Sequence, residues 1–177
     1  MPAFKFESQP ALFTPRFHLR SARLEDDAAI AAMRSDPRVN EFLERPGTTT
    51  IEQARQHIEK VLAGFANMDS LYWVISPKEN DQLLGIICLW NIVPALNRAE
   101  IGYELRSECW GNKIIQEVMP EVIRFGFEEM KLEKIIALSA VANIRSAKLL
   151  EGQQFVIDEA LKKELEPEGE HCYSRTR

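Results

Sequence analysis

Several short segments of the chain alternate apolar with polar residues, and this period of two predicts β-strands. The clearest of them is the segment 98–105, RAEIGYEL. Its apolar positions are Ala99, Ile101, Tyr103 and Leu105, and its other positions are Glu100, Gly102 and Glu104. One face of this strand is therefore expected to be apolar, while the opposite face carries two carboxylates that could look into a site.

Six further segments show strand patterns. They span residues 16–23, 71–76, 83–90, 131–141, 155–161 and 171–177. Turn-forming residues at 77–82 join the second and third of these into an antiparallel hairpin. The second strand of the hairpin is apolar throughout, so we expect it to be buried on both faces. Residues 91–98 contain Pro94 and are expected to form a loop, and residues 162–170 are expected to form a charged turn.

An apolar period of three to four residues predicts helices. The longest helix is expected to begin at Gly111 and to run to Met130. Its apolar stripe consists of Ile114, Ile115, Val118, Val122, Ile123, Phe125 and Phe127. A shorter helix is predicted through Met33, where Asp26 and Asp27 in the first turn suit the helix dipole, and a helical turn is predicted after residue 36.

Capping residues mark two more helices. Thr50, followed three residues later by Gln53, is a capping-box signature for a helix over residues 51–66. Its inward side chains are expected to be Ile51, Ala54, Ile58, Val61 and Leu62. Asn143 is a natural N-cap for a helix over residues 144–152, with Ala147 and Leu150 inward and Gly152 as its C-terminal stop.

The order of these elements predicts an α/β (α+β) fold with one mixed central sheet of six to seven strands and about four helices. The strand at 131–141 follows a long helix, so we expect it to run parallel to the strand at 98–105. The chain has 177 residues, of which 45% are hydrophobic and 28% are charged. This fits a single domain over residues 1–177, with residues 1–15 as an N-terminal arm.

Composition also argues against several classes of protein. No apolar run approaches the roughly 20 residues of a transmembrane helix, and the N-terminus lacks a signal-peptide pattern, so we expect a cytoplasmic protein. The net charge of −5, without clustered Lys and Arg, argues against a nucleic-acid surface. The cysteines and histidines are scattered: Cys88, Cys109, Cys172, His18, His57 and His171. Their spacing predicts neither a metal site nor a disulfide framework.

The junction between the strand at 98–105 and the long helix is the strongest candidate for a site. A helix N-terminus presents backbone N–H groups that have no partner within the helix, together with the positive end of the helix dipole. Such a terminus can bind an anion, for example a phosphate.

Three stretches of sequence resemble a known family. They are FLERPGTTTIEQARQHIE, LLGIICLWNIVPALNRAEIGYELRSECWGN and ANIRSAKLLEGQQF. They are similar to segments of the GNAT superfamily of N-acetyltransferases, in particular the branch of ribosomal-protein N-terminal acetyltransferases, and the resemblance covers roughly residues 15–177. It implies a GNAT-like sheet with a splayed pair of strands. It also implies that acetyl-CoA is the co-substrate and lies in the opening, with its pyrophosphate on the N-terminus of the long helix.

The resemblance further implies which residues act. The pyrophosphate-binding turn corresponds to Trp110, Gly111, Asn112, Lys113, Ile114 and Ile115. The strand end that contacts pantetheine corresponds to Tyr103, Glu104 and Leu105. Asn143 and Ser146 match positions near the pantetheine and the sulfur, and Ser146 would assist the departing thiolate. Glu100 matches a carboxylate that would accept the proton of the amine, directly or through water.

Four residues depart from the family's pattern. Relatives usually have glycine at the position of Lys113, glycine or alanine at that of Ile115, and glycine at that of Gln154, and some have a tyrosine proton donor at that of Leu150. Glycine suits the turn because the missing Cβ lets the backbone approach a phosphate. The Lys113 ammonium, in turn, would add attraction for a diphosphate.

Several alternatives stay open at this point. The acceptor could be a protein N-terminus or a small amine, the domain could be a degenerate binding or regulatory module with impaired cofactor binding, and a homodimer, even a purely structural one, is a further alternative. Glu100 could be a solvated strand residue, or Glu104 on the same face could raise its pKa. Ser146 could simply satisfy a backbone group at its helix start. Among the aromatic residues, we expect Tyr72, Trp73 and Trp90 in the core, and Phe42 as a wall of an acceptor pocket.

Overall fold

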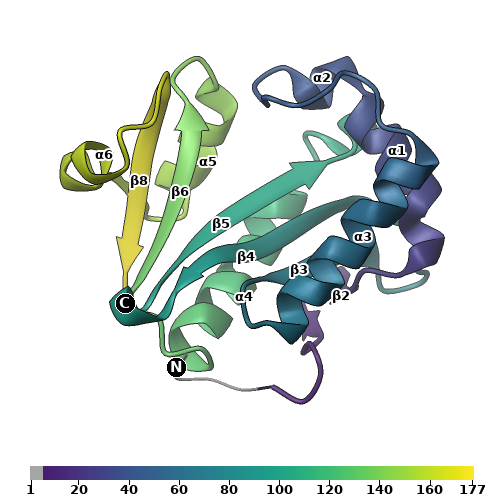
Figure 1. The fold of residues 1–177 in the computed structure, drawn as a ribbon, viewed down its shortest axis with the longest axis horizontal. Coiled ribbons are helices and arrows are strands. Elements are labelled where there is room, and N and C mark those ends of the chain that lie inside the picture. The colour runs from purple at the N-terminus through teal and green to yellow at the C-terminus, as the bar shows by residue number, and fades with distance from the viewer. Residues whose placement is uncertain (1–5) are drawn as a thin grey trace.

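The computed structural model describes residues 6–177, so the first five residues of the predicted arm lie outside it. One mixed sheet of eight strands forms its centre, in the order β1-β2-β3-β4-β5-β6-β8-β7 (Figure 1). The strands are β1 (Leu12–Phe13), β2 (Phe17–Ser21), β3 (Leu71–Pro77), β4 (Gly85–Val93), β5 (Arg98–Leu105), β6 (Lys134–Ala140), β7 (Val156–Ile157) and β8 (Glu170–Thr176). Neighbours are antiparallel except β5 and β6, which are parallel. The predicted mixed sheet and its parallel pair are therefore confirmed.

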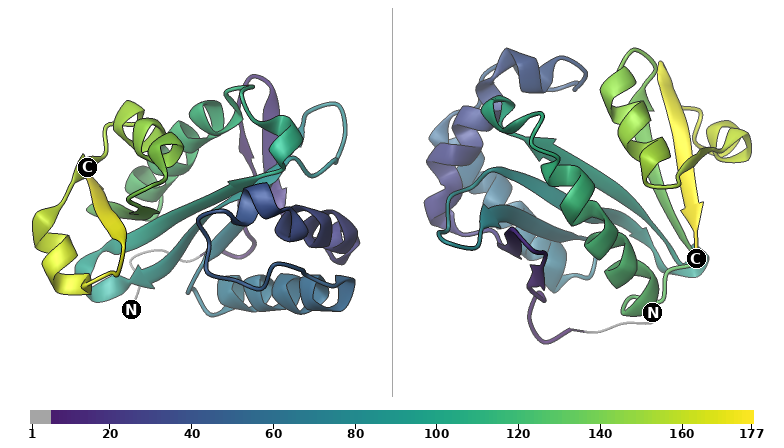
Figure 2. Two further views of the ribbon diagram at one scale, coloured as in Figure 1. Left: turned by 90° about the horizontal axis from the view of Figure 1, so that it is seen from above. Right: turned by 180° about the vertical axis from the view of Figure 1, so that it is seen from behind.

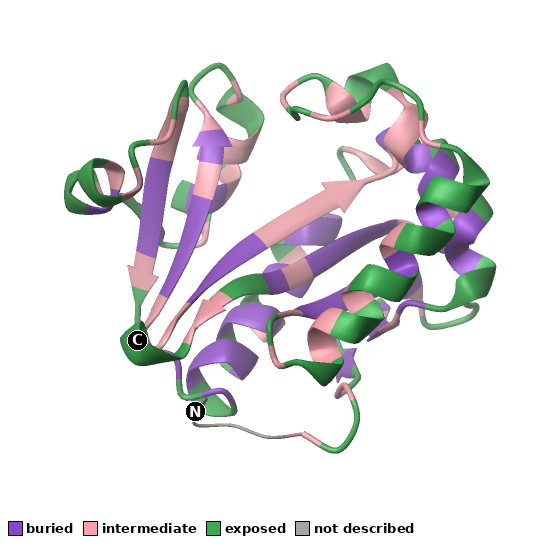
Figure 3. Ribbon diagram, in the orientation of Figure 1, coloured by how far each residue is buried: buried purple, intermediate pink, exposed green. Residues whose placement is uncertain are grey.

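The part of the chain that the structure describes contains six α-helices. They are α1 (Asp27–Ser35), α2 (Pro37–Asn40), α3 (Ile51–Ala66), α4 (Ile114–Glu128), α5 (Ile144–Gly152) and α6 (Glu159–Leu165). Residues of α4 and α5 share a buried cluster with one face of the sheet, and residues of α1 and α3 form a second cluster on the opposite face. Figure 2 shows the same division, with the sheet between the two groups of helices. Figure 3 shows the buried residues along the strands and the inner sides of these helices.

The C-terminal region differs from the sequence prediction. The strand expected at 155–161 is wrong beyond Ile157, and the charged turn expected at 162–170 is wrong for its first four residues, because α6 occupies residues 159–165. The Asp158 side chain accepts a hydrogen bond from the backbone N–H of Leu161 at 2.9 Å and so caps this helix. Leu161 then packs with Ile136 and Cys172. A side-chain cap and one apolar contact thus override the strand pattern.

Two other element boundaries also differ from the prediction. β4 continues to Val93 through an irregularity after Trp90, so the loop expected at 91–98 is partly strand. The long helix begins at Ile114 rather than at Gly111. The loop after β4 is therefore shorter than the sequence suggested, whereas the turn before α4 is longer.

In helix α3, only part of the predicted apolar stripe is buried. Its capping box is present as predicted, with the Gln53 N–H donating to the Thr50 hydroxyl and the Gln53 side chain accepting from the Thr50 N–H. Ala54 and Ile58 are fully buried, but Ile51 is 50% exposed. Leu62 is exposed as well, so the expected inward set is wrong at these two positions. The helix buries a narrow stripe because it covers the sheet from outside.

β5 and β6 pair only over a short stretch. Arg98, Ala99 and Glu100 lie opposite residues 134–136, and no pair follows although both strands continue. Figure 1 shows the two strands diverging from this common end. Residues 101–105 of β5 therefore pair with β4 alone, and their other edge borders an opening.

No described helix has the length and apolar character needed to cross a membrane.

Candidate functional site

A cavity of about 580 Å³ lies where the end of β5, the turn before α4, the start of α5 and the segment after α2 meet. Ten of the eleven predicted cofactor-site residues line it: Tyr103, Glu104, Leu105, Trp110, Gly111, Lys113, Ile114, Ile115, Asn143 and Ser146. Asn112 does not. Its side-chain amide donates to the backbone carbonyls of Cys109 and Trp110, at 3.1 and 3.4 Å, so it stabilises the turn itself.

The strand edge inside the cavity has free hydrogen-bonding groups. Beyond Glu100, the side of β5 that faces β6 forms no ladder pairs, although Tyr103, Glu104 and Leu105 remain in strand conformation. Backbone N–H and C=O groups at such an edge are available to an extended ligand. A chain of amides, such as a pantetheine arm, could add to this edge as a further strand does.

The turn before α4 is shaped by two residues with positive φ. Gly111 has φ +80, and Lys113, the N-cap residue, has φ 56 and ψ 29. Lys113 thus adopts the left-handed conformation that glycine adopts at low cost, and a non-glycine residue there costs about 1–2 kcal/mol. No side chain caps the helix. Its first backbone N–H groups therefore remain free to bind an anion.

The remaining departures from the family's pattern have structural explanations. Gln154 has φ 64, so it too holds a left-handed position where relatives have glycine. Leu150 is fully buried, and Ile115 is only 5% exposed and belongs to the main core. The side chain of Ile115 is therefore mostly in the core, although it borders the cavity.

Basic side chains surround the uncapped helix terminus. Lys113, Arg145 and Lys148 all line the cavity. The Arg145 guanidinium lies over the Trp110 ring, 4.0 Å from its centroid. Sequence reasoning missed Arg145 and Lys148, which α5 carries close to Ser146. The sequence does show these two basic residues three positions apart, in a helix whose N-cap, Asn143, was predicted.

Asn143, Ser146 and Tyr103 form a hydrogen-bonded group at the start of α5. The Asn143 side chain accepts from the Ser146 backbone N–H at 3.1 Å, which confirms the predicted cap. The Ser146 hydroxyl lies 2.9 Å from the Tyr103 hydroxyl. Burial raises the pKa of Tyr103 to about 12, so its hydroxyl keeps its proton at neutral pH. The Ser146 hydroxyl is therefore bound to a side chain rather than to the backbone of its own helix.

Glu100 lies on the other face of β5 from Tyr103 and does not line the cavity. It is buried, with 7% of its surface exposed. Burial raises the pKa of its carboxyl to about 7, a hydrogen bond with Asn91 opposes the rise, and the charge of Glu170 adds to it. The expectation that Glu104 causes this shift is wrong. Glu104 instead accepts a hydrogen bond from Arg45 at 2.5 Å.

The aromatic residues divide differently from the prediction. Tyr72 and Trp73 are buried, as expected, but Trp90 is 45% exposed. Phe42 lines the cavity. Sequence pattern alone could not separate Trp90 from the others because all three lie in apolar strand segments.

Among residues 6–177, no group of three or more His, Cys, Asp or Glu side chains could hold a metal ion. Cys172 is buried, and Cys88 and Cys109 are half-buried free thiols.

Comparison with known proteins gives consistent results. A family model described as Acetyltransferase (GNAT) domain matches residues 16–156. The chain is 35% identical over 149 residues to an uncharacterized N-acetyltransferase, p20, of Bacillus licheniformis, covering 81% of each chain. Among solved structures, it matches Mycobacterium smegmatis RimJ in complex with CoA-disulfide, with a TM-score of 0.79, 22% identity and coverage of 94% of this chain and 86% of that one. It also matches the ribosomal-protein-S5-alanine acetyltransferase of Vibrio fischeri, with a TM-score of 0.76, 20% identity and coverage of 94% and 96%.

Proposed function

Because the chain belongs to the acetyltransferase (GNAT) family and is an N-acetyltransferase of that family, we propose that it binds acetyl-CoA in the cavity described above and transfers the acetyl group to a primary amine. The observation that carries this proposal is the shape of the cavity. It joins the uncapped N-terminus of α4 to the unpaired end of β5.

The residues present suit the two ends of acetyl-CoA, which supplies an acetyl group activated as a thioester. The backbone N–H groups at the start of α4 and the cations Lys113, Arg145 and Lys148 would hold the phosphates. The free edge of β5 at Tyr103 to Leu105 would hold the pantetheine amides. Asn143 fixes the start of α5 and so keeps Ser146 at the cavity.

Two groups on opposite faces of β5 would move protons. An amine is mostly an ammonium ion at neutral pH, and it must lose a proton before it can attack a thioester. Glu100, with a pKa near 7, can take that proton while remaining partly ionised at neutral pH. On the other face, Ser146 would donate a proton to the departing sulfur, and the Tyr103 hydroxyl would restore it through their hydrogen bond.

For the acceptor, we favour a protein or peptide N-terminus over a small amine. The support is the structural likeness to a ribosomal-protein-S5-alanine acetyltransferase, together with the resemblance of several sequence stretches to that branch. A panel of peptides with free N-termini, set against spermidine and simple alkylamines, tests this choice directly. Acetylation of small amines alone would reverse it.

Acetyl-CoA should raise the melting temperature of the protein. At a concentration of about 100 times Kd the ligand adds about 2.7 kcal/mol, or roughly 5–10 °C for a chain of this size. Replacing Arg145 and Lys148 together by alanine should weaken binding roughly tenfold or more. Arg124→Ala on the exposed side of α4 is the matched control and should bind as the wild type does. No shift at millimolar acetyl-CoA would contradict the proposed function.

The alternative of a degenerate domain makes a different prediction for the turn. If Lys113 has abolished productive binding, Lys113→Gly should raise the affinity for acetyl-CoA greatly. Under the proposed function it should instead lower the affinity, because the Lys113 ammonium helps to hold the phosphates and its backbone already has the conformation of glycine. Isothermal titration of both proteins measures this. Ile115 is left unchanged, since truncating a buried side chain would destabilise the core by about 2–5 kcal/mol.

Ser146→Ala should lower kcat about 10²-fold with little change in the KM for acetyl-CoA, because proton donation matters only as the sulfur leaves. Tyr103→Phe should lower kcat about tenfold. The double variant should be no slower than Ser146→Ala, since residues that act through one another are not additive. Steady-state kinetics of the three variants measure this, and strictly additive losses would show that Tyr103 does not act through Ser146.

A further inference from the structure

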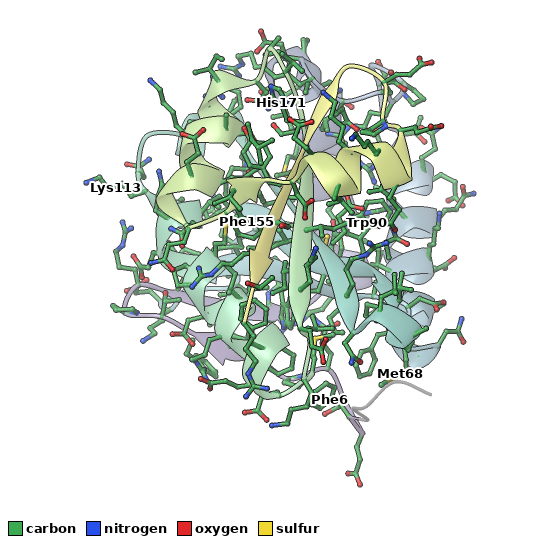
Figure 4. All side chains as sticks on the ribbon, turned by 90° about the vertical axis from the view of Figure 1, so that its left-hand side faces the viewer. Phe6, Met68, Trp90, Lys113, Phe155 and His171 are labelled. Carbon is green, nitrogen blue, oxygen red and sulfur yellow. The ribbon has the colours of Figure 1, made fainter. Side chains whose placement is uncertain are left out.

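Trp90 is an exposed aromatic residue beside the proposed base. It lies on β4 directly opposite Glu100 on β5. Directly opposed residues of an antiparallel pair project to the same face, with their Cβ atoms about 5 Å apart. The indole is 45% exposed while the Glu100 carboxyl beside it is buried. Figure 4 shows Trp90 and Lys113 on opposite sides of the sheet, so Trp90 lies away from the proposed phosphate end of the cavity.

Gly102 explains how the indole is seated. It is two residues after Glu100 on the same face, between Glu100 and Glu104. A Cβ at Gly102 would lie 3.4 Å from Nε1 and 3.7 Å from Cδ1 of Trp90, and 3.2 Å from the Cys88 sulfur. The indole therefore lies over the glycine and fills the space between the two carboxylates.

The charges around this ring favour a cation. Glu104 is paired with Arg45, whereas the hydrogen-bond partner of Glu100 is the neutral Asn91. The charge of Arg98 also acts on Glu100, but the Arg98 guanidinium itself pairs with Glu164. The carboxylate of Glu170 is close enough to act on Glu100. The face of an indole attracts ammonium groups, with a strength of about 0.5–2 kcal/mol. An exposed indole face next to a carboxylate is thus suited to a primary ammonium ion.

We infer that Trp90 is a specificity-determining residue of the acceptor site, where its ring receives the acceptor as a primary ammonium ion beside Glu100. This rests on the proposed function, because it takes Glu100 as the base. One proton then passes from the ammonium nitrogen to a carboxylate oxygen of Glu100, which leaves the neutral amine with its lone pair free. The ring thereby selects cationic amines at the place where they are deprotonated.

The intrinsic fluorescence of the full-length protein tests this without catalysis. Of the three tryptophans, Trp73 is buried and Trp110 lines the cavity in which coenzyme A is kept throughout, whereas Trp90 is exposed and should respond to added amine. With coenzyme A present, L-alaninamide and spermidine serve as ammonium probes, and N-acetyl-L-alaninamide serves as the uncharged counterpart. We expect at least one ammonium probe to change the fluorescence of the wild type, the change to be lost in Trp90→Phe, and the acetylated probe to have no effect.

Kinetics supply the second readout. Trp90→Ala should raise the KM for the acceptor roughly 3- to 30-fold, as loss of a cation–π contact predicts, and leave the KM for acetyl-CoA within twofold. Trp90→Phe keeps an aromatic face and should recover most of the loss. Val156→Ala, at another exposed apolar residue on β7, should behave as the wild type does.

Three results would overturn the inference: an amine signal that persists in Trp90→Phe, an equal signal from the acetylated probe, or an acceptor KM that is unchanged in Trp90→Ala. The two proposals fail separately. If the wild type shows no acetyl-CoA melting shift, the function is contradicted. If it shows that shift but no fluorescence change with an ammonium probe, only the role of Trp90 is contradicted.

Discussion

Glu100→Gln should lower kcat about 10²- to 10⁴-fold while acetyl-CoA still binds, because the amide cannot accept the proton of the acceptor amine. In the wild type, kcat/KM should rise with pH and level off above a pKa near 7, the value that burial gives this carboxyl. Steady-state rates between pH 5.5 and 9 measure both effects. Retention of more than about a tenth of the activity, with an unchanged pH profile, would place the base elsewhere.

Glu170→Gln is the matched control for this profile. It removes a charge that raises the pKa of Glu100 and does not itself take the proton. The acid limb of kcat/KM should therefore move to lower pH, and the rate at high pH should stay close to that of the wild type. A limb that does not move would mean that burial alone sets the pKa of Glu100.

The same shift has a consequence for stability. The Glu100 carboxyl titrates near 4.5 in the unfolded chain and near 7 in the folded one. Between these values the folded protein holds a proton that the unfolded chain releases, so the free energy of unfolding falls as the pH rises through this window. In Glu100→Gln the free energy of unfolding does not fall in this window, because the amide does not titrate. It should be more stable than the wild type above pH 7, by up to about 3 kcal/mol, at about 1.4 kcal/mol per pKa unit.

Asp26→Ala should lower the free energy of unfolding by about 3–5 kcal/mol, because it removes the buried partner of the Arg20 guanidinium and leaves only the exposed Asp81 carboxylate, 3.8 Å away. The two side chains form a bidentate pair with N–O distances of 2.7 and 2.9 Å. Each side chain is only 8% exposed. Asp26 also accepts a hydrogen bond from the Arg23 backbone N–H at 2.8 Å, so the variant loses a turn contact as well.

Urea denaturation measures this loss, and Glu121→Ala provides the control. Glu121 pairs with Arg124 on the exposed side of α4 at 2.9 Å. An exposed pair of this kind contributes less than about 1 kcal/mol. Equal losses in the two variants would show that burial adds nothing to the Arg20–Asp26 pair.

The role of Asp26 illustrates where sequence reasoning stopped. From the sequence, Asp26 suited the first turn of a helix, which is a local argument. In the structure its partner is Arg20 on β2, and the pair is covered by the packed domain. Local patterns cannot show burial of this kind, because it depends on segments that are distant in the chain.

Local patterns and tertiary packing also contribute separately at the candidate site. Ten of the eleven residues that the family resemblance predicts for a cofactor site line one cavity, because the resemblance fixes the turn and the strand end. Arg145 and Lys148 were missed, since only the packing of α5 brings them to the start of α4. The cause of the raised pKa of Glu100 was also missed, because Glu170 reaches it from β8, about 70 positions further along the chain.

The sequence by itself determined the order of the main strands, the parallel pair and the caps at Thr50 and Asn143. The strands and caps depend on side-chain alternation or on contacts three residues apart, which are local quantities, and the parallel pair follows from the helix that connects its two strands. Only the tertiary structure decided that Lys113 takes a left-handed conformation and that Trp90 stays exposed beside a buried Glu100. Exposure and charge environment are set by which distant segments cover a side chain, and the folded chain alone brings those segments together.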